Sequence, residues 1–151
     1  MHQLTYRRAT SADIPAMSNI RLSVRENILS NPALVTYQMY EDYLGLLGRG
    51  WVCELHGEII GFSYAAMNDH SIWALFLDPK HEGLGAGKVL LQLACQYLFE
   101  EGAQTVQLST NVATRAEAFY LAQGWIRGDM KDGDEVYFQL DRATWNLRLL
   151  A

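Results

Sequence analysis

Three glycines alternate with other residues between an apolar run and a helix-like pattern, and this segment constrains the fold most. The apolar run is Ser71–Leu77, and Gly83, Gly85 and Gly87 follow it. Glycine adopts dihedral angles that other residues avoid, and it lets the main chain approach a ligand closely. Main-chain N–H groups at a helix start bind phosphate, because the positive end of the helix dipole lies there. The segment predicts a buried strand, a phosphate-binding turn and a helix.

Two common phosphate-binding motifs do not fit this spacing. A P-loop requires glycine at position 82 and serine or threonine at position 89, where the chain has Glu82 and Val89. The dinucleotide fingerprint requires glycine at position 88 or 90, where the chain has Lys88 and Leu90. Both classes are disfavoured, and a protein that binds ATP on the glycine turn stays open as a minor alternative.

The remaining periodicity predicts a mixed α/β chain with antiparallel hairpins. Thr10 and Thr36 stand where helix caps are expected, and His56-Gly57 is typical of a hairpin turn. The predicted strands cover 3–8, 51–55, 58–66, 71–77, 104–110, 125–130 and 135–140. The predicted helices cover 11–31, 36–47, 88–101 and 114–123. The predicted order is therefore β-α-α-β-β-β-α-β-α-β-β.

Composition narrows the class of protein further. The chain has 151 residues, of which 50% are hydrophobic and 19% charged, so one domain spanning residues 1–151 is expected. A net charge of −5 argues against a nucleic-acid partner. No signal-like or membrane-spanning apolar run is present in the sequence, which predicts a cytoplasmic protein without a membrane partner. Cys53 and Cys95 are expected to be buried free thiols, and no metal site is expected because the histidines are scattered.

Two segments resemble one known family. The glycine turn resembles the pyrophosphate loop of the GCN5-related N-acetyltransferase (GNAT) superfamily, in which Gln or Arg is followed by two residues, Gly, one residue and Gly or Ala. Gly85 and Gly87 fill the glycine positions, whereas Glu82 departs from Gln or Arg. The segment from Asn111 to Trp125 is similar to the C-terminal motif of the same family. This motif often has Asn at the position of Ala113.

The resemblance implies a fold and a ligand. The fold is α/β (α+β): the GNAT fold, with a central mixed, mostly antiparallel sheet whose fourth and fifth strands splay apart. The ligand is acetyl-CoA, whose pantetheine arm lies in the splayed gap and pairs with the main chain as an added strand would. The implied coenzyme-binding residues are Leu75, Phe76, Leu77, Glu82, Gly83, Leu84, Gly85, Ala86, Gly87, Lys88, Asn111, Ala116, Phe119 and Tyr120.

The implied activity is transfer of an acetyl group to a primary amine by direct attack. Tyr120 matches the tyrosine that faces the coenzyme sulfur in the family, which makes it the expected general acid. The main-chain N–H of Leu77 or Phe76 is expected to stabilise the developing oxyanion. The general base is not identified: Glu26, Asp69 and His70 are candidates, and a water chain is the alternative.

Several expectations concern partners. The acceptor is a small-molecule amine, a peptide N-terminus or a lysine, and no sequence pattern distinguishes them. A non-catalytic protein of the same fold that binds acetyl-CoA is the alternative function. A homodimer is expected from family habit and from the apolar C-terminal segment Trp145–Leu150.

Overall fold

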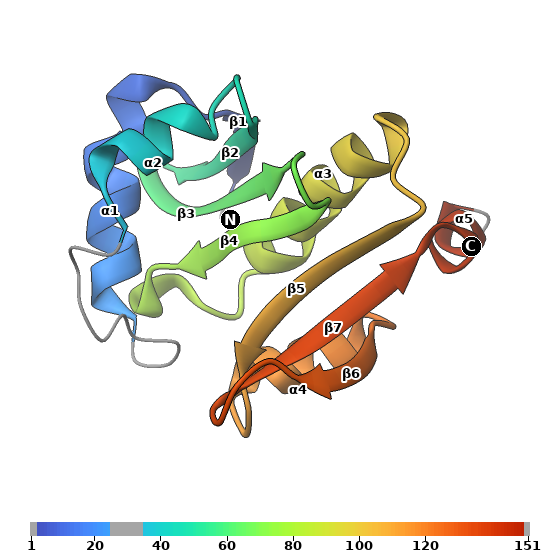
Figure 1. The fold of residues 1–151 in the computed structure, drawn as a ribbon. Coiled ribbons are helices and arrows are strands. Elements are labelled where there is room, and N and C mark those ends of the chain that lie inside the picture. The colour runs from blue at the N-terminus through green and yellow to red at the C-terminus, as the bar shows by residue number, and fades with distance from the viewer. Residues whose placement is uncertain (1–2, 25–34, 150–151) are drawn as a thin grey trace.

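The structure, a computed structural model, describes residues 3–24 and 35–149. Seven strands form one sheet in the order β1-β2-β3-β4-β5-β7-β6, flanked by helices (Figure 1). The strands are β1 (Leu4–Arg8), β2 (Gly48–Leu55), β3 (Glu58–Ala66), β4 (Ser71–Leu77), β5 (Thr105–Asn111), β6 (Ile126–Met130) and β7 (Glu135–Asp141). The helices are α1 (Ile14–Ser23), α2 (Tyr37–Asp42), α3 (Ala86–Glu100), α4 (Arg115–Ala122) and α5 (Arg142–Leu149), with short 3-10 turns η1 (Ser11–Asp13) and η3 (Pro79–His81).

The sheet is mostly antiparallel, as the sequence predicts. Among the described strands, β4 and β5 are the one neighbouring pair that runs parallel. The predicted order of strands and helices through β7 is confirmed. The hairpin between β2 and β3 turns at His56 and Gly57, whose φ angles are 53° and 81°. Left-handed angles at both central residues match the right-handed twist of the flanking strands, so this turn was predictable from its sequence.

Two hydrophobic clusters cover the two faces of the sheet. α3 packs on one face with residues such as Cys53 of β2 and Ile60 of β3. α1 and α2 pack on the other face, against Val52 and Phe62 of the same strands. Because successive side chains of a strand point to opposite faces, both faces of β2 and β3 are apolar and buried. Cys53 and Cys95 are both buried and free, as expected.

The structure corrects two predicted boundaries. The predicted second helix was expected to reach position 47 and stop at Gly48 and Gly50, but α2 ends at Asp42 and both glycines belong to β2. A Cβ at position 48 would lie 1.9 Å from the carbonyl oxygen of Ala65, so glycine is required by close approach to β3 rather than by a helix end. α1 ends at Ser23, and the predicted continuation over 25–31 lies outside the described residues.

The C-terminal segment forms a helix that the sequence did not indicate. Trp145–Leu150, which is expected to pack on a neighbouring molecule, belongs largely to helix α5. Trp145 is buried and stacks on Phe99 of α3, with 5.4 Å between ring centroids. α5 therefore closes the core of its own chain. No described helix is both long and apolar enough to cross a membrane.

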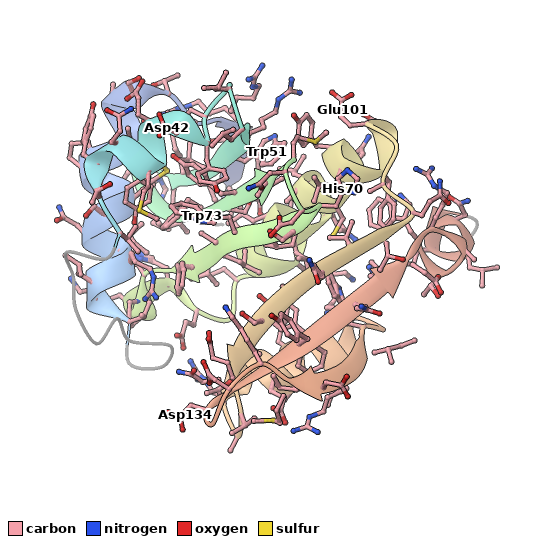
Figure 2. All side chains as sticks on the ribbon, viewed as in Figure 1. Asp42, Trp51, His70, Trp73, Glu101 and Asp134 are labelled. Carbon is pink, nitrogen blue, oxygen red and sulfur yellow. The ribbon has the colours of Figure 1, made fainter. Side chains whose placement is uncertain are left out.

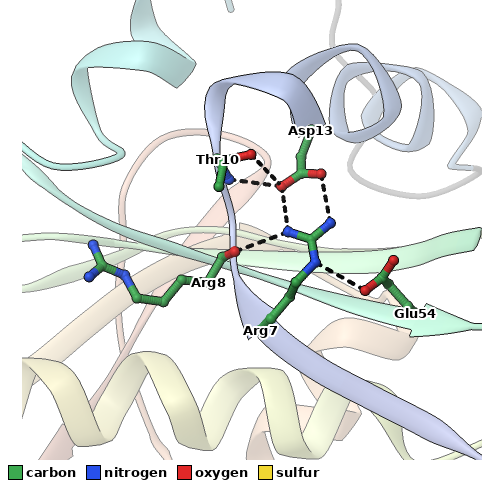
Figure 3. A network of polar contacts seen from close by, with 5 residues as sticks. All are labelled: Arg7, Arg8, Thr10, Asp13 and Glu54. Carbon is green, nitrogen blue, oxygen red and sulfur yellow. Dashed lines mark hydrogen bonds and ion pairs between the residues drawn. The ribbon is translucent and has the colours of Figure 1, made fainter. Parts of the chain in front are cut away.

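A charged network ties the start of α1 to the sheet (Figure 3). Arg7 of β1 donates two hydrogen bonds to the Asp13 carboxylate, at 2.8 and 2.9 Å, and one to Glu54 of β2 at 3.0 Å. The N–H of Thr10 donates to Asp13 at 2.8 Å. The adjacent Arg7 guanidinium lowers the pKa of the Asp13 carboxyl below its usual range, despite the opposing effect of burial.

Asp13→Asn is expected to lower the free energy of unfolding at pH 7 by about 2 kcal/mol, since it weakens a cap and a charge-assisted bidentate contact. A depressed folded-state pKa means that this stability is present above about pH 3.9, the usual carboxyl pKa. It is lost as the pH falls through the lower folded value. Urea unfolding of both proteins at pH 7 and pH 3 checks this. Asp129→Asn, at an exposed site on edge strand β6, is the control. An Asp13→Asn deficit of equal size at both pH values would contradict the assignment.

Candidate active site

The parallel strands β4 and β5 meet at one end and diverge toward the other (Figure 1). Their register contains a single pair, Ser71 opposite Gln107. The N–H of Gln107 donates to the carbonyl of His70 at 3.1 Å, and His70 marks this joined end in Figure 2. Antiparallel pairing resumes between β5 and β7 over the whole of β5. The sheet is therefore intact on both sides of a gap that opens toward the C-terminal ends of β4 and β5, as predicted.

A cavity of about 520 Å³ lies at the open end of this gap, beside the start of α3. Gly83 and Gly85 in the preceding turn have φ angles of 82° and 85°, which are left-handed values that favour glycine. A Cβ at either position would meet no protein atom within 4 Å. Gly85 is the N-cap of α3 and offers no side chain to the amides behind it. The space around the turn is therefore open, and its main-chain amides can donate hydrogen bonds to an anion.

Gly87 lies in a different environment from the two preceding glycines. It lies inside the first turn of α3, where an added Cβ would stand 3.5 Å from Leu77 and 3.9 Å from Phe119. These are ordinary van der Waals distances, so close packing alone does not require glycine at this position. Gly87 also lines the cavity.

Most of the predicted coenzyme residues line this cavity. Those that do are Leu75, Phe76, Leu77, Glu82, Gly83, Gly87, Ala116, Phe119 and Tyr120. Leu84, Gly85, Ala86 and Lys88 belong to the adjoining turn and helix start without lining it, and Asn111 lines the neighbouring cavity instead. The cavity also includes Val24, Pro79 and Arg115, which the sequence did not indicate. These residues reach the cavity through packing between segments that are distant in sequence, which no local motif indicates.

The main-chain N–H groups of β4 point alternately toward β3 and toward the gap. Asp78, just after β4, donates its N–H to the Ile60 carbonyl of β3 at 2.8 Å. Since N–H directions alternate along a strand, Phe76 also faces β3, whereas Leu75 and Leu77 face the gap. Of the two main-chain donors considered for the oxyanion, this orientation favours Leu77 over Phe76. It also adds Leu75 as a candidate.

A second cavity, of about 1030 Å³, lies along β4 and β5 and extends to α2. Its walls are the aromatic side chains of α2 and β4, including Tyr40 and Trp73, and the polar side chains of β5. Trp73 and Asp134 both line it, and Figure 2 shows Trp73 on the β4 side of the gap and Asp134 beyond the C-terminal end of β5. The acidic residues in its lining are Asp69, Asp132, Asp134 and Glu135, and the basic ones are Arg21 and Lys131. Acidic groups thus outnumber basic ones around this cavity.

Tyr120 lies where the two cavities adjoin. Leu75, Phe76, Ala116 and Tyr120 line both of them. Tyr120 is 7% exposed and packs beside Phe119, Trp125 and Phe138. Burial raises the pKa of its phenol, and the neighbouring Cys95 thiol raises it further. The hydroxyl therefore stays protonated through the physiological range and is able to donate a proton.

The candidate bases are not gathered at this junction. Glu26 lies outside the described residues, and His70 lines neither cavity. Asp69 lines the larger cavity near the joined end of β4 and β5, where it accepts a hydrogen bond from Ser71 at 2.6 Å. Leu75 lies four positions after Ser71 along the strand, a distance of about 13 Å. No carboxylate among the described residues lines both cavities, so this geometry favours proton removal through water.

Two departures from the family pattern have structural correlates. Glu82 forms an ion pair with Arg115, the first residue of α4, so its carboxylate has a cationic partner. Ala113, where the family often has Asn, has a φ angle of 59° in the turn between β5 and α4. Asn occupies left-handed conformations more readily than Ala, which accounts for Asn as the usual residue of this turn.

Comparisons with known proteins agree with this geometry. Three similar folds are PaiA N-acetyltransferase from Thermoplasma acidophilum in complex with coenzyme A, yncA from Salmonella typhimurium with its cofactor acetyl-CoA, and ribosomal-protein-alanine N-acetyltransferase from Brucella melitensis. Their identities to this chain are 16%, 19% and 22%, and their TM-scores are 0.79, 0.76 and 0.74. The alignments cover 92%, 91% and 91% of this chain and 99%, 93% and 99% of the other chains. No protein of curated function matches with significance.

The sequence itself identifies the family more directly than these folds do. The model of the acetyltransferase (GNAT) family matches residues 17–125, which is well over half of the 151 residues. That span runs from α1 to the end of the second motif and includes the glycine turn and Tyr120. The chain therefore belongs to the acetyltransferase (GNAT) family.

Proposed function

We propose that this protein transfers an acetyl group from acetyl-CoA to a primary amine by direct attack. The observation that carries the proposal is the pair of cavities that adjoin at Leu75 and Tyr120 between the splayed strands. A thioester bound in the smaller cavity and an amine bound in the larger one would meet there without leaving the protein. Such convergence supplies the proximity and orientation that a bimolecular reaction needs.

The smaller cavity fits the coenzyme. The amides from Gly83 to Lys88 would bind its diphosphate, because the turn is unobstructed and opens helix α3. The pantetheine arm would lie along β4 and pair with the gap-facing groups of Leu75 and Leu77, as an added strand would. This path leads from the glycine turn to Tyr120. The PaiA structure with coenzyme A and the yncA structure with acetyl-CoA support this choice of acyl donor.

The chemistry follows from the groups at the junction. The neutral amine attacks the thioester carbonyl, and the N–H of Leu77, or of Leu75 one repeat deeper, stabilises the oxyanion. The C–S bond then breaks, and the Tyr120 phenol gives its proton to the departing thiolate. The proton that the nitrogen carries after the attack passes, directly or through water, to the Tyr120 phenolate, which yields the neutral amide and restores the phenol. A thiol with a pKa near 8.5 is a fair leaving group, so this proton accelerates the step without being indispensable.

The amine must lose a proton before it attacks. An alkyl ammonium has a pKa near 10.4 and is almost wholly charged at pH 7. The polar β5 wall of the larger cavity, which includes Gln107 and Ser109, would hold the water that carries this proton to solvent. The excess of acidic residues around the same cavity favours a cationic acceptor over an anionic one.

An acetylation screen tests the proposal. Purified protein is incubated with acetyl-CoA and a panel of polyamines, aminoglycosides, amino acids and peptides with free N-termini or lysines, and thiol release is followed. The proposal predicts amine-dependent release and an acetylated product seen by mass spectrometry. If coenzyme A binds but no amine is acetylated, the protein is a coenzyme-binding module rather than an enzyme.

A further inference from the structure

The ion pair between Glu82 and Arg115 crosses the opening of the smaller cavity. Glu82 follows η3 on the β4 side of the gap, and Arg115 begins α4 on the β5 side. Both residues line the cavity, although they are 33 positions apart in sequence. The pair therefore joins the two halves of the sheet at the end where β4 and β5 no longer pair.

The charges of this cavity are concentrated in the same pair. Among the described residues that line it, Glu82 and Arg115 are the ionised ones, and the others are apolar residues, glycines and Tyr120. Side-chain exposure is 74% for Arg115 and 39% for Glu82. An ion pair this exposed is weak, because water solvates both partners well. An anion that enters the cavity is repelled by Glu82 and attracted by Arg115.

A phosphate group is a better partner for Arg115 than the carboxylate is. Arginine binds phosphate through two parallel charge-assisted hydrogen bonds, and a diphosphate carries more charge than one carboxylate. Glu82 lies directly before the glycine turn, so a diphosphate held by the turn amides would stand close to both members of the pair. The first position of the turn motif has Gln or Arg in the family, and here a cation reaches the same place from α4.

We infer that Arg115 is a specificity residue for the acyl donor, which exchanges Glu82 for the diphosphate of the coenzyme when the coenzyme binds. This inference rests on the proposed function. In the free protein, Glu82 holds the guanidinium over the cavity. In the complex, the guanidinium binds the diphosphate and the carboxylate turns to solvent. Glu82 thereby weakens coenzyme binding, which aids the release of the coenzyme A product.

Four proteins separate this exchange from simple charge neutralisation. They are the wild type, Glu82→Gln, Arg115→Gln and the double variant, each titrated calorimetrically with acetyl-CoA. Glu82→Gln should bind about threefold to tenfold more tightly, because Arg115 no longer has to leave the carboxylate. Arg115→Gln should weaken binding about tenfold, and the loss should be at least as large when Glu82→Gln is also present.

The result that overturns the inference is specific. If Arg115 only neutralises Glu82, Arg115→Gln will weaken binding in the wild-type background but have no effect in the Glu82→Gln background. Arg127→Gln removes a less exposed pair with Glu117, 4.0 Å apart and outside both cavities, and should leave affinity unchanged. If wild-type protein does not bind acetyl-CoA at all, the proposed function fails rather than this inference alone.

Donor analogues identify the phosphate concerned. Dephospho-acetyl-CoA retains the diphosphate but lacks the ribose phosphate, so the effect of Arg115→Gln on its binding should persist. Acetyl-pantetheine lacks the diphosphate, so the KM of wild type and Arg115→Gln for this donor should agree. An Arg115 effect that disappears with dephospho-acetyl-CoA, or persists with acetyl-pantetheine, would contradict the assignment to the diphosphate.

Discussion

Gly85→Val should raise the KM for acetyl-CoA about a hundredfold and leave kcat at saturating donor much less affected. Gly85 has a φ angle of 85° and is the N-cap of α3. A β-branched residue cannot adopt this angle without strain, so the turn will change shape or the side chain will enter the space above its amides. Loss of one or two charge-assisted hydrogen bonds to phosphate corresponds to about 3 kcal/mol. Steady-state kinetics with varied acetyl-CoA measures the effect.

Gly102→Val is the matched control for Gly85→Val. Gly102 follows the far end of α3, has a φ angle of 106°, and likewise has no protein atom within 4 Å of the place where a Cβ would stand. Both variants should lose comparable stability, about 1–3 kcal/mol, because both place a branched residue in a left-handed conformation. Only Gly85→Val should lose affinity for the donor. Equal KM values for the two variants would mean that the turn does not bind the coenzyme.

Tyr120→Phe should lower kcat about a hundredfold while changing the KM for acetyl-CoA little. Tyr120 lines both cavities, and general acid catalysis contributes factors of this size. The ring packs beside Trp125 and Phe138, and Phe preserves these contacts. Steady-state kinetics at saturating donor and acceptor measure kcat. Tyr97→Phe on α3 is the control for the loss of a phenol hydroxyl elsewhere in the protein.

The pH dependence of kcat is a second test of Tyr120 as the general acid. Burial raises the pKa of the phenol above its usual value of about 10, so the acid form persists to higher pH. The wild type should therefore show no alkaline loss of kcat from this group below about pH 10. A Tyr120→Phe variant with wild-type kcat, or a wild-type rate that falls with an apparent pKa near 8 and does so only when Tyr120 is present, would contradict the general acid role.

The parts of the fold that were predictable depend on local signals. The glycine turn lies between an apolar strand and an amphipathic helix, and each of these features is encoded within a few neighbouring residues. The cap at Thr36 is also local, and its side chain accepts a hydrogen bond from the N–H of Met39, as a cap residue is expected to do. The other predicted cap, Thr10, precedes the 3-10 turn η1 rather than α1 itself. The turn at His56-Gly57 is a local signal as well. Such signals indicated the order of the elements, whereas the position of the gap was implied by the resemblance to the family.

The parts that were missed depend on contacts between distant residues. α5 alternates polar and apolar residues along its sequence, and it is held by Trp145 stacking on Phe99. The role of Gly48 is visible only once β3 lies beside it. Arg115 could not be linked to Glu82 from the sequence, because their contact forms only after both strands join the sheet. The proton path from the amine is likewise a property of the assembled cavity.

The proposed activity depends on binding of the diphosphate of an acyl-bearing coenzyme by the turn from Gly83 to Lys88. Calorimetric titration of the wild-type protein with acetyl-CoA tests this binding most directly. We expect saturable binding of one acetyl-CoA per chain, competition by coenzyme A, and loss of most of the affinity in Gly85→Val but not in Gly102→Val. Absence of binding heat at several temperatures, or undiminished affinity in Gly85→Val, would contradict this role of the turn.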